Sequence, residues 1–119
     1  MSQDFQAGDF LIFQIESAYG LLRILAVEET QNGTVWHLAA YNEMFLGIEM
    51  ADAALENSSS LTISRPHLAV TNRAFESTQV ARMKNEPLDE VELKLYREWI
   101  ENPNSKVSDT SVRLLLGLR

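Results

Sequence analysis

Three apolar stretches rich in β-branched and aromatic residues fill the first third of the chain, and two turn signals separate them. They occupy residues 10–16, 21–27 and 35–41. The second turn signal, Asn32-Gly33, predicts a type I′ hairpin, because both residues tolerate the positive φ that this turn requires. The first, around 17–20, predicts a longer turn. We therefore expect an antiparallel meander of three strands, apolar on both faces, as in a sheet covered on two sides or curled into a barrel.

The pattern between residues 42 and 86 is less regular, and it contains one proline that bears on strand assignment. Pro66 lacks the N–H that a sheet ladder needs, so it predicts a strand end or an edge. In order, the expected segments are a bent continuation of the third strand at 42–48, a helical turn at 49–55, a loop at 57–60, short strands at 61–65 and 67–71, and a strand or helical turn at 78–84.

The clearest helix is predicted over 87–101. Asn85 is the expected cap, and Pro87 falls in the first turn, where its missing N–H costs nothing. The apolar residues recur at helical spacing: Leu88, Val91, Leu95 and Trp99. This periodicity indicates a face packed on the sheet, with Trp99 as the anchor. The following segment, 108–118, fits a second helix or an alternating strand, and we favour the helix.

Together these elements predict one α+β domain over residues 1–119. Residues 1–84 are expected to be mostly β and 85–119 mostly α. The expected architecture is a curved antiparallel sheet or small open barrel of about five or six strands, closed by the C-terminal helix and its apolar tail.

The net charge of −7 is distributed unevenly. Residues 1–60 contain nine acids and one base, Arg23, whereas residues 61–119 contain eight acids and nine bases. The acidic first half would repel a phosphate backbone, which disfavours nucleic-acid binding. An acidic face suits a basic protein partner by steering its approach, and it equally serves solubility.

The sequence carries few residues in arrangements typical of catalysis. Cysteine is absent, the five glycines are isolated, and no phosphate-binding or dinucleotide motif occurs. The two histidines, His37 and His67, lie thirty residues apart without metal-ligand spacing. We therefore predict no catalytic residue, no metal site and no cofactor, and we favour a non-enzymatic protein. His37 is expected to be half-buried with its hydrogen bonds satisfied, and His67 receives no role.

Neither a secretory leader nor a membrane span is expected. The N-terminal residues contain no basic cluster followed by an apolar segment, and no apolar run approaches about 20 residues. These features predict a cytoplasmic protein without membrane contacts.

Arg23 is the most informative single residue, because it is the one charge in an apolar row. A buried guanidinium needs a carboxylate partner or a bound anion. The alternatives are a structural ion pair, an arginine whose head reaches water, and an anion site. Aromatic residues and arginine are enriched at binding hot spots, so the predicted contact residues are Arg23, Trp36, Tyr41 and Glu43.

Two short motifs resemble bacterial immunity domains, which neutralise polymorphic toxins. Gly8-Asp9 precedes an apolar strand, and Tyr19-Gly20 is followed after two leucines by Arg23. Some immunity domains open with Gly-Asp, a hydrophobic strand and Tyr-Gly-x-x-Arg. The resemblance covers about the first quarter of the chain. It implies inhibition by binding, without catalysis.

Three function classes follow from these observations. The first is a small protein-binding module, with an immunity-type inhibitor of a basic toxin as one form. The second is an assembly protein that forms a homodimer through the C-terminal apolar segment or a strand edge. The third is a small-ligand binder or enzyme with a pocket near Arg23, where a histidine or carboxylate would converge.

Overall fold

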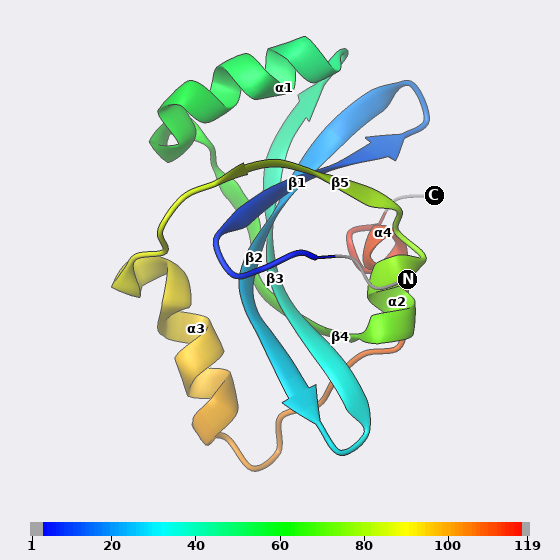
Figure 1. Cartoon of the computed structure of the whole chain (residues 1–119), viewed down its shortest axis with the longest axis vertical. Helices are drawn as coiled ribbons and strands as arrows, with labels where there is room; N and C mark the ends of the chain where they lie inside the picture. The colour runs from blue at the N-terminus through cyan, green and yellow to red at the C-terminus, as the bar shows by residue number, and fades with distance from the viewer. Residues whose placement is uncertain (1–3, 118–119) are drawn as a thin grey trace.

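The three-strand meander is present and forms the centre of a five-stranded antiparallel sheet in the computed structural model (Figure 1). The structure describes residues 4–117. The strand order is β4-β3-β2-β1-β5, and the sheet stays open. The elements are β1 (Asp9–Ile15), β2 (Ala18–Thr30), β3 (Gly33–Phe45), α1 (Ile48–Ala54), the 3-10 helix η1 (Leu55–Ser60), β4 (Ile63–Thr71), α2 (Asn72–Glu76), β5 (Val80–Asn85), α3 (Glu90–Glu101) and α4 (Val112–Leu115). The α+β prediction is confirmed in its open-sheet form.

The β2–β3 hairpin forms at the predicted place but with a different turn. It reverses over two residues between the paired residues Thr30 and Gly33. Gly33 has a φ of 112°, whereas Glu16 and Gln79 are the described non-glycine residues with positive φ. Asn32 thus lacks the left-handed conformation of a type I′ turn, and that prediction is wrong. The Thr30 hydroxyl stabilises the turn instead: it accepts from the Asn32 N–H and donates to the Gly33 carbonyl.

The β1–β2 turn is shorter and earlier than predicted. Ile15 pairs with Ala18, so two residues make the reversal, and Glu16 accommodates it with a φ of 48°. Gly20 lies inside β2, against the ring of Phe13, where a Cβ atom would come within 2.8 Å of Cζ. Close packing, and not a turn, therefore requires glycine at this position.

Both faces of the sheet are covered, which explains why the strands carry apolar residues on both sides. One core contains Leu11, Phe13, Leu22, Ile24, Trp36, Leu38, Ala40 and Val70 of the sheet, packed on Ala74 and Phe75 of α2 and Val112 of α4. The other contains Phe10, Ile12, Leu21 and Tyr41, packed on Ala51 of α1 and Leu55 of η1. Helix α3 lies beside the second core, over β2 and β4 (Figure 1). Burial on both faces is the physical reason for the nearly continuous apolar runs.

The two short strands predicted around Pro66 are one strand, β4. Pro66 is tolerated inside it because β4 is an edge of the sheet, so one side of its backbone needs no ladder partner. The pairing with β3 shifts here, because Leu38 pairs with Leu68 but Ala40 pairs with Arg65. This extra residue on β4 is a bulge that accommodates the proline.

Helix α3 begins at Glu90, three residues after the predicted start, and Asp89 is its cap. The Asp89 carboxylate accepts from the Glu92 N–H, and the Glu92 carboxylate accepts from the Asp89 N–H, which completes a capping box. The prediction of Asn85 as the cap is wrong. Asn85 ends β5, and its side-chain amide donates to Asp9 at the start of the adjacent strand β1.

The ambiguous segments resolve into short elements. Residues 49–55 are largely α1, and 78–84 are largely β5. Within 108–118 only four residues form a helix, α4, and Leu118 lies outside the described residues. Helix α2 was not predicted; its cap is Thr71, whose hydroxyl accepts from the Ala74 N–H. As far as residue 84 the described chain is therefore mostly β, with α1, η1 and α2 between its strands.

None of the helices within residues 4–117 combines the length and the apolarity that crossing a bilayer requires.

Candidate functional site

Arg23 is buried, with 2% of its surface exposed, and it joins β2 to α3. Its Nε donates to Glu92 Oε2 at 3.0 Å, and Nη2 donates to Glu92 Oε1 at 3.3 Å. Nη2 also donates to the Pro87 carbonyl at 3.1 Å, and Nη1 donates to the Gly8 carbonyl. The guanidinium carbon lies 4.2 Å from the centre of the Phe10 ring. Because all three nitrogens have protein acceptors, this arginine forms a structural ion pair and does not present an open anion site.

A cavity of about 290 Å³ lies beside Arg23, as the ligand-binding alternative requires. The side chains around it are already engaged with each other. Glu86 accepts from the Ser58 hydroxyl at 2.8 Å, and Asp89 caps α3. Burial raises the pKa of Tyr41 to about 12, which makes its hydroxyl a poor acid or base at neutral pH. The carboxylates at this cavity, like Arg23, are therefore bound within the protein.

The four predicted contact residues do not form one exposed surface. Arg23, Trp36 and Tyr41 are buried, and Trp36 lies in the core on the opposite face from Tyr41. Glu43 is half-buried, and its carboxylate accepts from the N–H and the hydroxyl of Thr62. Hydrophobic burial thus outweighs the interface preference of these residue types. Of the four, Glu43 has access to a partner.

The two histidines, thirty residues apart in the sequence, lie side by side. His37 pairs with Ala69 across the β3–β4 ladder, so His67, two residues along β4, is its diagonal neighbour on the same face. His37 Nδ1 lies 3.0 Å from His67 Nε2, and the two rings stack at 12°. Tyr96 and Trp99 of α3 cover both rings, with ring centres between 4.6 and 6.2 Å apart. His37 is completely buried.

Glu28 extends this pair into a chain of three side chains on neighbouring strands. Its Oε1 lies 3.0 Å from His37 Nε2. A carboxylate accepts hydrogen bonds, so His37 Nε2 donates, and Nδ1 of the same neutral ring must accept. His67 Nε2 is therefore the donor to His37 Nδ1. A hydrogen-bonded chain runs from His67 through His37 to Glu28, across β4, β3 and β2.

Burial lowers the pKa of both imidazoles. For His37 the burial outweighs the opposite effect of the Glu28 carboxylate. For His67 burial and the neighbouring His37 together lower the pKa to about 4. Both rings are consequently neutral at pH 7, and His67 is a weak base there. The chain orients Glu28 and supports α3.

The expectation for His37 understated its burial, and the partnership of His67 was missed. Each histidine shares a strand with apolar residues, and neither strand's pattern by itself indicates the other histidine. The signal that could have joined them is their position on the same face of adjacent strands. That signal requires the β3–β4 register, which local patterns do not contain.

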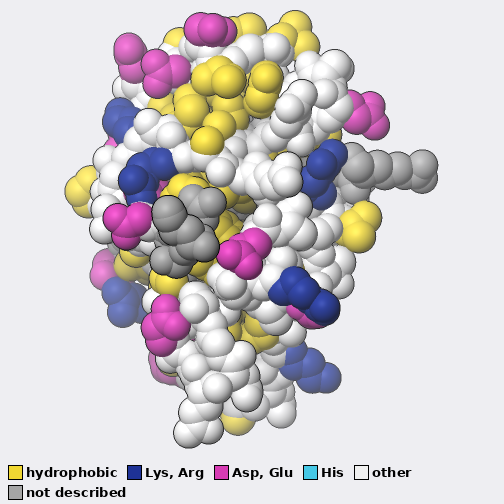
Figure 2. Space-filling view, turned by 45° about the vertical axis from the view of Figure 1, so that its right-hand side comes forward, with side chains coloured by type: hydrophobic (Ala, Val, Ile, Leu, Met, Phe, Trp, Pro, Cys, Tyr) yellow, Lys and Arg dark blue, Asp and Glu magenta, His cyan; other side chains and the backbone are white. Residues whose placement is uncertain are grey.

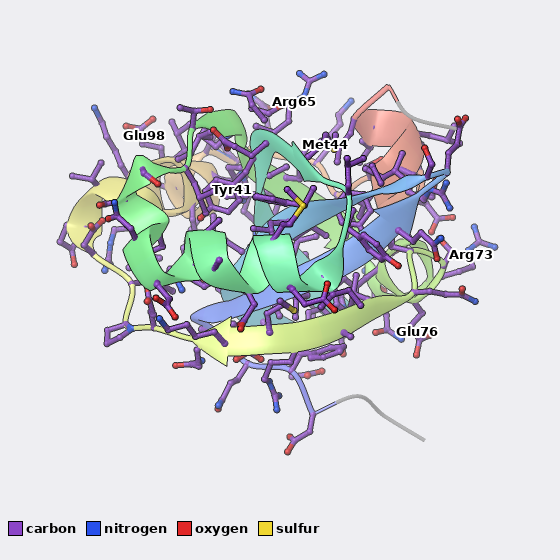
Figure 3. The ribbon with its side chains drawn as sticks, turned by 90° about the horizontal axis from the view of Figure 1, so that it is seen from above. Tyr41, Met44, Arg65, Arg73, Glu76 and Glu98 are labelled. Carbon is purple, nitrogen blue, oxygen red and sulfur yellow. The ribbon has the colours of Figure 1, made fainter. Side chains whose placement is uncertain are left out.

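Four large apolar side chains are exposed together where β3 ends and α1 begins. Figure 2 shows hydrophobic side chains gathered at the end of the molecule where α1 lies in Figure 1, with acidic side chains at the margin. Figure 3 views this end from above, with α1 in front and Met44 near it. The exposed fractions are 49% for Met44, 77% for Leu46, 47% for Ile48 and 54% for Met50. We call these four residues the 44–50 surface.

The 44–50 surface lies in the acidic half of the sequence. No lysine or arginine occurs between Arg23 and Arg65, whereas six acids do. The acids nearest to the surface in the sequence are Glu43, Glu49, Asp52 and Glu56. Ile48 also lines a groove of about 640 Å³ that continues past Tyr19 to β5. The surface thus combines an apolar centre, an acidic margin and an adjoining hollow.

Among residues 4–117, no group of three or more histidine and carboxylate side chains has an arrangement that could hold a metal ion.

Comparison of the chain with protein-family models, with curated proteins and with solved structures finds no match.

Proposed function

We propose that this chain is a small protein-binding module whose 44–50 surface docks on a basic protein. The observation that carries the proposal is the exposure of Met44, Leu46, Ile48 and Met50 within seven consecutive residues, at the end of the molecule where Figure 2 shows hydrophobic side chains gathered. Isolated exposed apolar residues need no explanation, but a contiguous group with a polar margin is typical of an interaction site. Methionine adapts to irregular partner surfaces, which suits such a role.

Charge supports a basic partner over a second copy of this chain. The acids around the surface would repel an identical acidic surface across a two-fold axis. They would attract lysine and arginine side chains and increase the rate of encounter. The C-terminal route to a homodimer also has less support, because Val112 is fully buried in the chain's own core and Leu115 and Leu116 pack against that core.

An immunity-type inhibitor is the concrete form that we favour. The residues of the two motifs that resemble immunity domains make structural contacts. The Gly8 carbonyl accepts from Arg23, and Gly20 packs on Phe13. The carboxylate of buried Asp9 accepts from Arg82 at 2.9 Å. Because these residues have structural roles, the resemblance supports a similar fold and does not identify the binding surface. The inhibitor would act by occluding a basic toxin through the 44–50 surface, without chemistry of its own.

The proposal is tested with the double substitution Leu46→Ser and Ile48→Ser. The partner to use is a basic toxin encoded beside this chain, prepared in inactive form, with binding measured by calorimetry. We expect the double substitution to weaken binding, with about 2 kcal/mol from each position, since each change removes an exposed apolar anchor from the centre of the interface. Raising the salt concentration should slow association, because exposed charges are screened.

Val91→Ser is the matched control, because Val91 is 85% exposed on α3, away from the 44–50 surface. It should leave binding unchanged. The proposal fails if the partner binds the double variant as tightly as the wild-type chain, or if Val91→Ser is equally damaging. A neighbouring toxin that does not bind the wild-type chain removes the immunity-type form.

A further inference from the structure

A slot of about 450 Å³ lies at the end of the sheet remote from the 44–50 surface. The β2–β3 hairpin forms one side, and Thr71 with the start of α2 forms another. Trp99 of α3 and Val107 of the segment after it also line the slot. The volume falls in the range of pockets that hold small molecules or single side chains.

Glu28 supplies the negative charge of this slot. The other charged residue in its lining is Arg73, whose guanidinium donates to both carboxylate oxygens of Asp109. Arg73 is highly exposed, and in Figure 3 it points outward from α2. The charge of Arg73 is therefore compensated by Asp109, and Glu28 remains without a cationic neighbour in the lining.

The two histidines hold Glu28 in place without cancelling its charge. His37 Nε2 donates to Glu28 Oε1, and His37 is itself held by His67. Burial lowers the pKa of both rings, so at neutral pH the partner of the carboxylate is a neutral imidazole. The side chain of Glu28 is 38% exposed, which leaves it accessible from the slot.

Trp99 adds a second group that favours cations. Its indole packs edge-on against His37, with ring centres 4.9 Å apart, and it lines the same slot as Glu28. Indole faces attract ammonium and guanidinium groups, most strongly where water is excluded. Val35 and Val107 provide apolar wall for an alkyl chain.

We propose that the slot between Glu28 and Trp99 binds an organic cation, namely a primary ammonium or guanidinium group on an alkyl chain. The carboxylate receives the hydrogen bonds of the cation, the indole adds its attraction for the charged group, and the valines contact the alkyl chain. A free alkylamine and a lysine or arginine side chain of another protein share this chemistry. The site stands apart from the 44–50 surface, so its test is independent of the proposed function.

The test is an NMR titration of the wild-type chain with butylammonium, followed at the indole N–H signals. The Trp99 signal should shift and saturate, and it should shift further than the signal of Trp36, whose indole donates to Asn72 in the slot lining. Butanol, the neutral counterpart, should bind at least about tenfold more weakly, because it lacks the charge that Glu28 recognises.

Glu28→Gln should weaken butylammonium binding at least about tenfold, since glutamine keeps an oxygen acceptor for His37 but removes the charge. Glu29→Gln is the matched control: Glu29 is exposed, accepts from the Thr34 hydroxyl and lines a different cavity. The control should bind like the wild-type chain. Thermal melts establish that both variants are folded, and the comparison with butanol needs no variant.

N-acetyl-lysine methylamide distinguishes the two sources of the cation. Tighter binding of this compound than of butylammonium indicates a side chain presented by a polypeptide, whereas equal or weaker binding indicates a free amine. The proposal is overturned if the Trp99 signal does not shift at tens of millimolar butylammonium. It is also overturned if butanol binds equally well, or if Glu29→Gln weakens binding as much as Glu28→Gln.

Discussion

Helix α3 is attached to the sheet at two places that use opposite physical chemistry. Near its start, Glu92 pairs with the buried Arg23 of β2. Near its end, Tyr96 and Trp99 cover the stacked imidazoles of β3 and β4. The first attachment is an ion pair with fixed donor and acceptor geometry. The second is an aromatic cluster that stays uncharged at neutral pH.

The difference between the attachments predicts how each of them fails. A buried charge must keep its partner, because losing one half leaves the other desolvated and unpaired. An aromatic cluster loses stability in proportion to the surface that becomes exposed. Removal of a single carboxylate should therefore cost more than truncation of a large, half-buried ring. Only the cluster should respond to mild acid, because imidazoles titrate there.

Glu92→Gln should have the largest effect. It removes the charge facing Arg23 but retains an oxygen that can accept from the Asp89 N–H in the capping box. We expect a loss of about 3 kcal/mol in the free energy of unfolding, at the lower end for broken buried pairs because two carbonyls still accept from Arg23. Urea unfolding followed by circular dichroism measures it.

Glu90→Gln is the control for this substitution. Glu90 is two residues away and pairs with Arg97 at 3.1 Å on the solvent face of α3. Exposed pairs contribute little, so the change should stay below about 1 kcal/mol. Equal losses for Glu92→Gln and Glu90→Gln would show that the Arg23 pair is no more important than a surface pair.

Trp99→Ala should have an intermediate effect, of about 2 kcal/mol, because the ring is half-buried and its loss uncovers the imidazoles. Ile100→Ala, at a neighbouring residue that is 52% exposed, should change stability by less than about 0.5 kcal/mol. Chemical unfolding of both variants measures these two losses in the free energy of unfolding. A loss for Trp99→Ala no larger than that for Ile100→Ala would contradict the anchoring role.

Mild acid should change stability gradually, without any substitution, and should separate the two attachments. The pKa of His67 in the folded chain is about 4, below the value of about 6.5 for an unperturbed histidine. Between these values the unfolded chain binds a proton that the folded chain does not. Stability is thus complete above pH 6.5 and falls as the pH decreases toward 4, by at most about 1.4 kcal/mol per pH unit for this ring.

His67→Gln should reduce the slope between pH 7.5 and 5 and leave the contribution of His37, whereas Glu92→Gln should lower stability throughout and keep the slope. Unfolding curves at several pH values in that window provide the measurement, and the window lies above the range in which carboxylates titrate. If stability falls with pH as steeply in the His67→Gln variant as in the wild-type chain, the acid response comes from other groups.

The outline of the fold was predictable because it depends on periodicity. The alternating apolar runs before Tyr41 reflect which side chains a strand must bury. The helix was predicted, but its sheet-facing stripe was wrong in part: Val91 and Leu95 are exposed, and Glu92 and Tyr96 contact the sheet together with Trp99. Details that depend on one residue failed. The type I′ turn at Asn32, the cap at Asn85 and the strand break at Pro66 each had a competing local arrangement that the three-dimensional context favoured.

The candidate sites were less predictable than the fold. Arg23 was correctly identified as a charge in need of a partner, but Glu92, 69 residues away, was not identifiable as that partner. Trp36 and Tyr41 are residue types common at interfaces, and the core buries both of them. The 44–50 surface follows from how α1 covers the sheet, which leaves Leu46 and its neighbours outside.

By itself the sequence determined that residues 10–41 form strands covered on two faces, because burial imposes a period on apolar positions, and it indicated a helix before residue 102. Only the tertiary structure decided which polar groups meet. The register of β3 and β4 brings His67 to His37, and the packing of α3 brings Glu92 to Arg23. Local periodicity contains no information on contacts between distant segments, since register and packing are settled by the whole core at once.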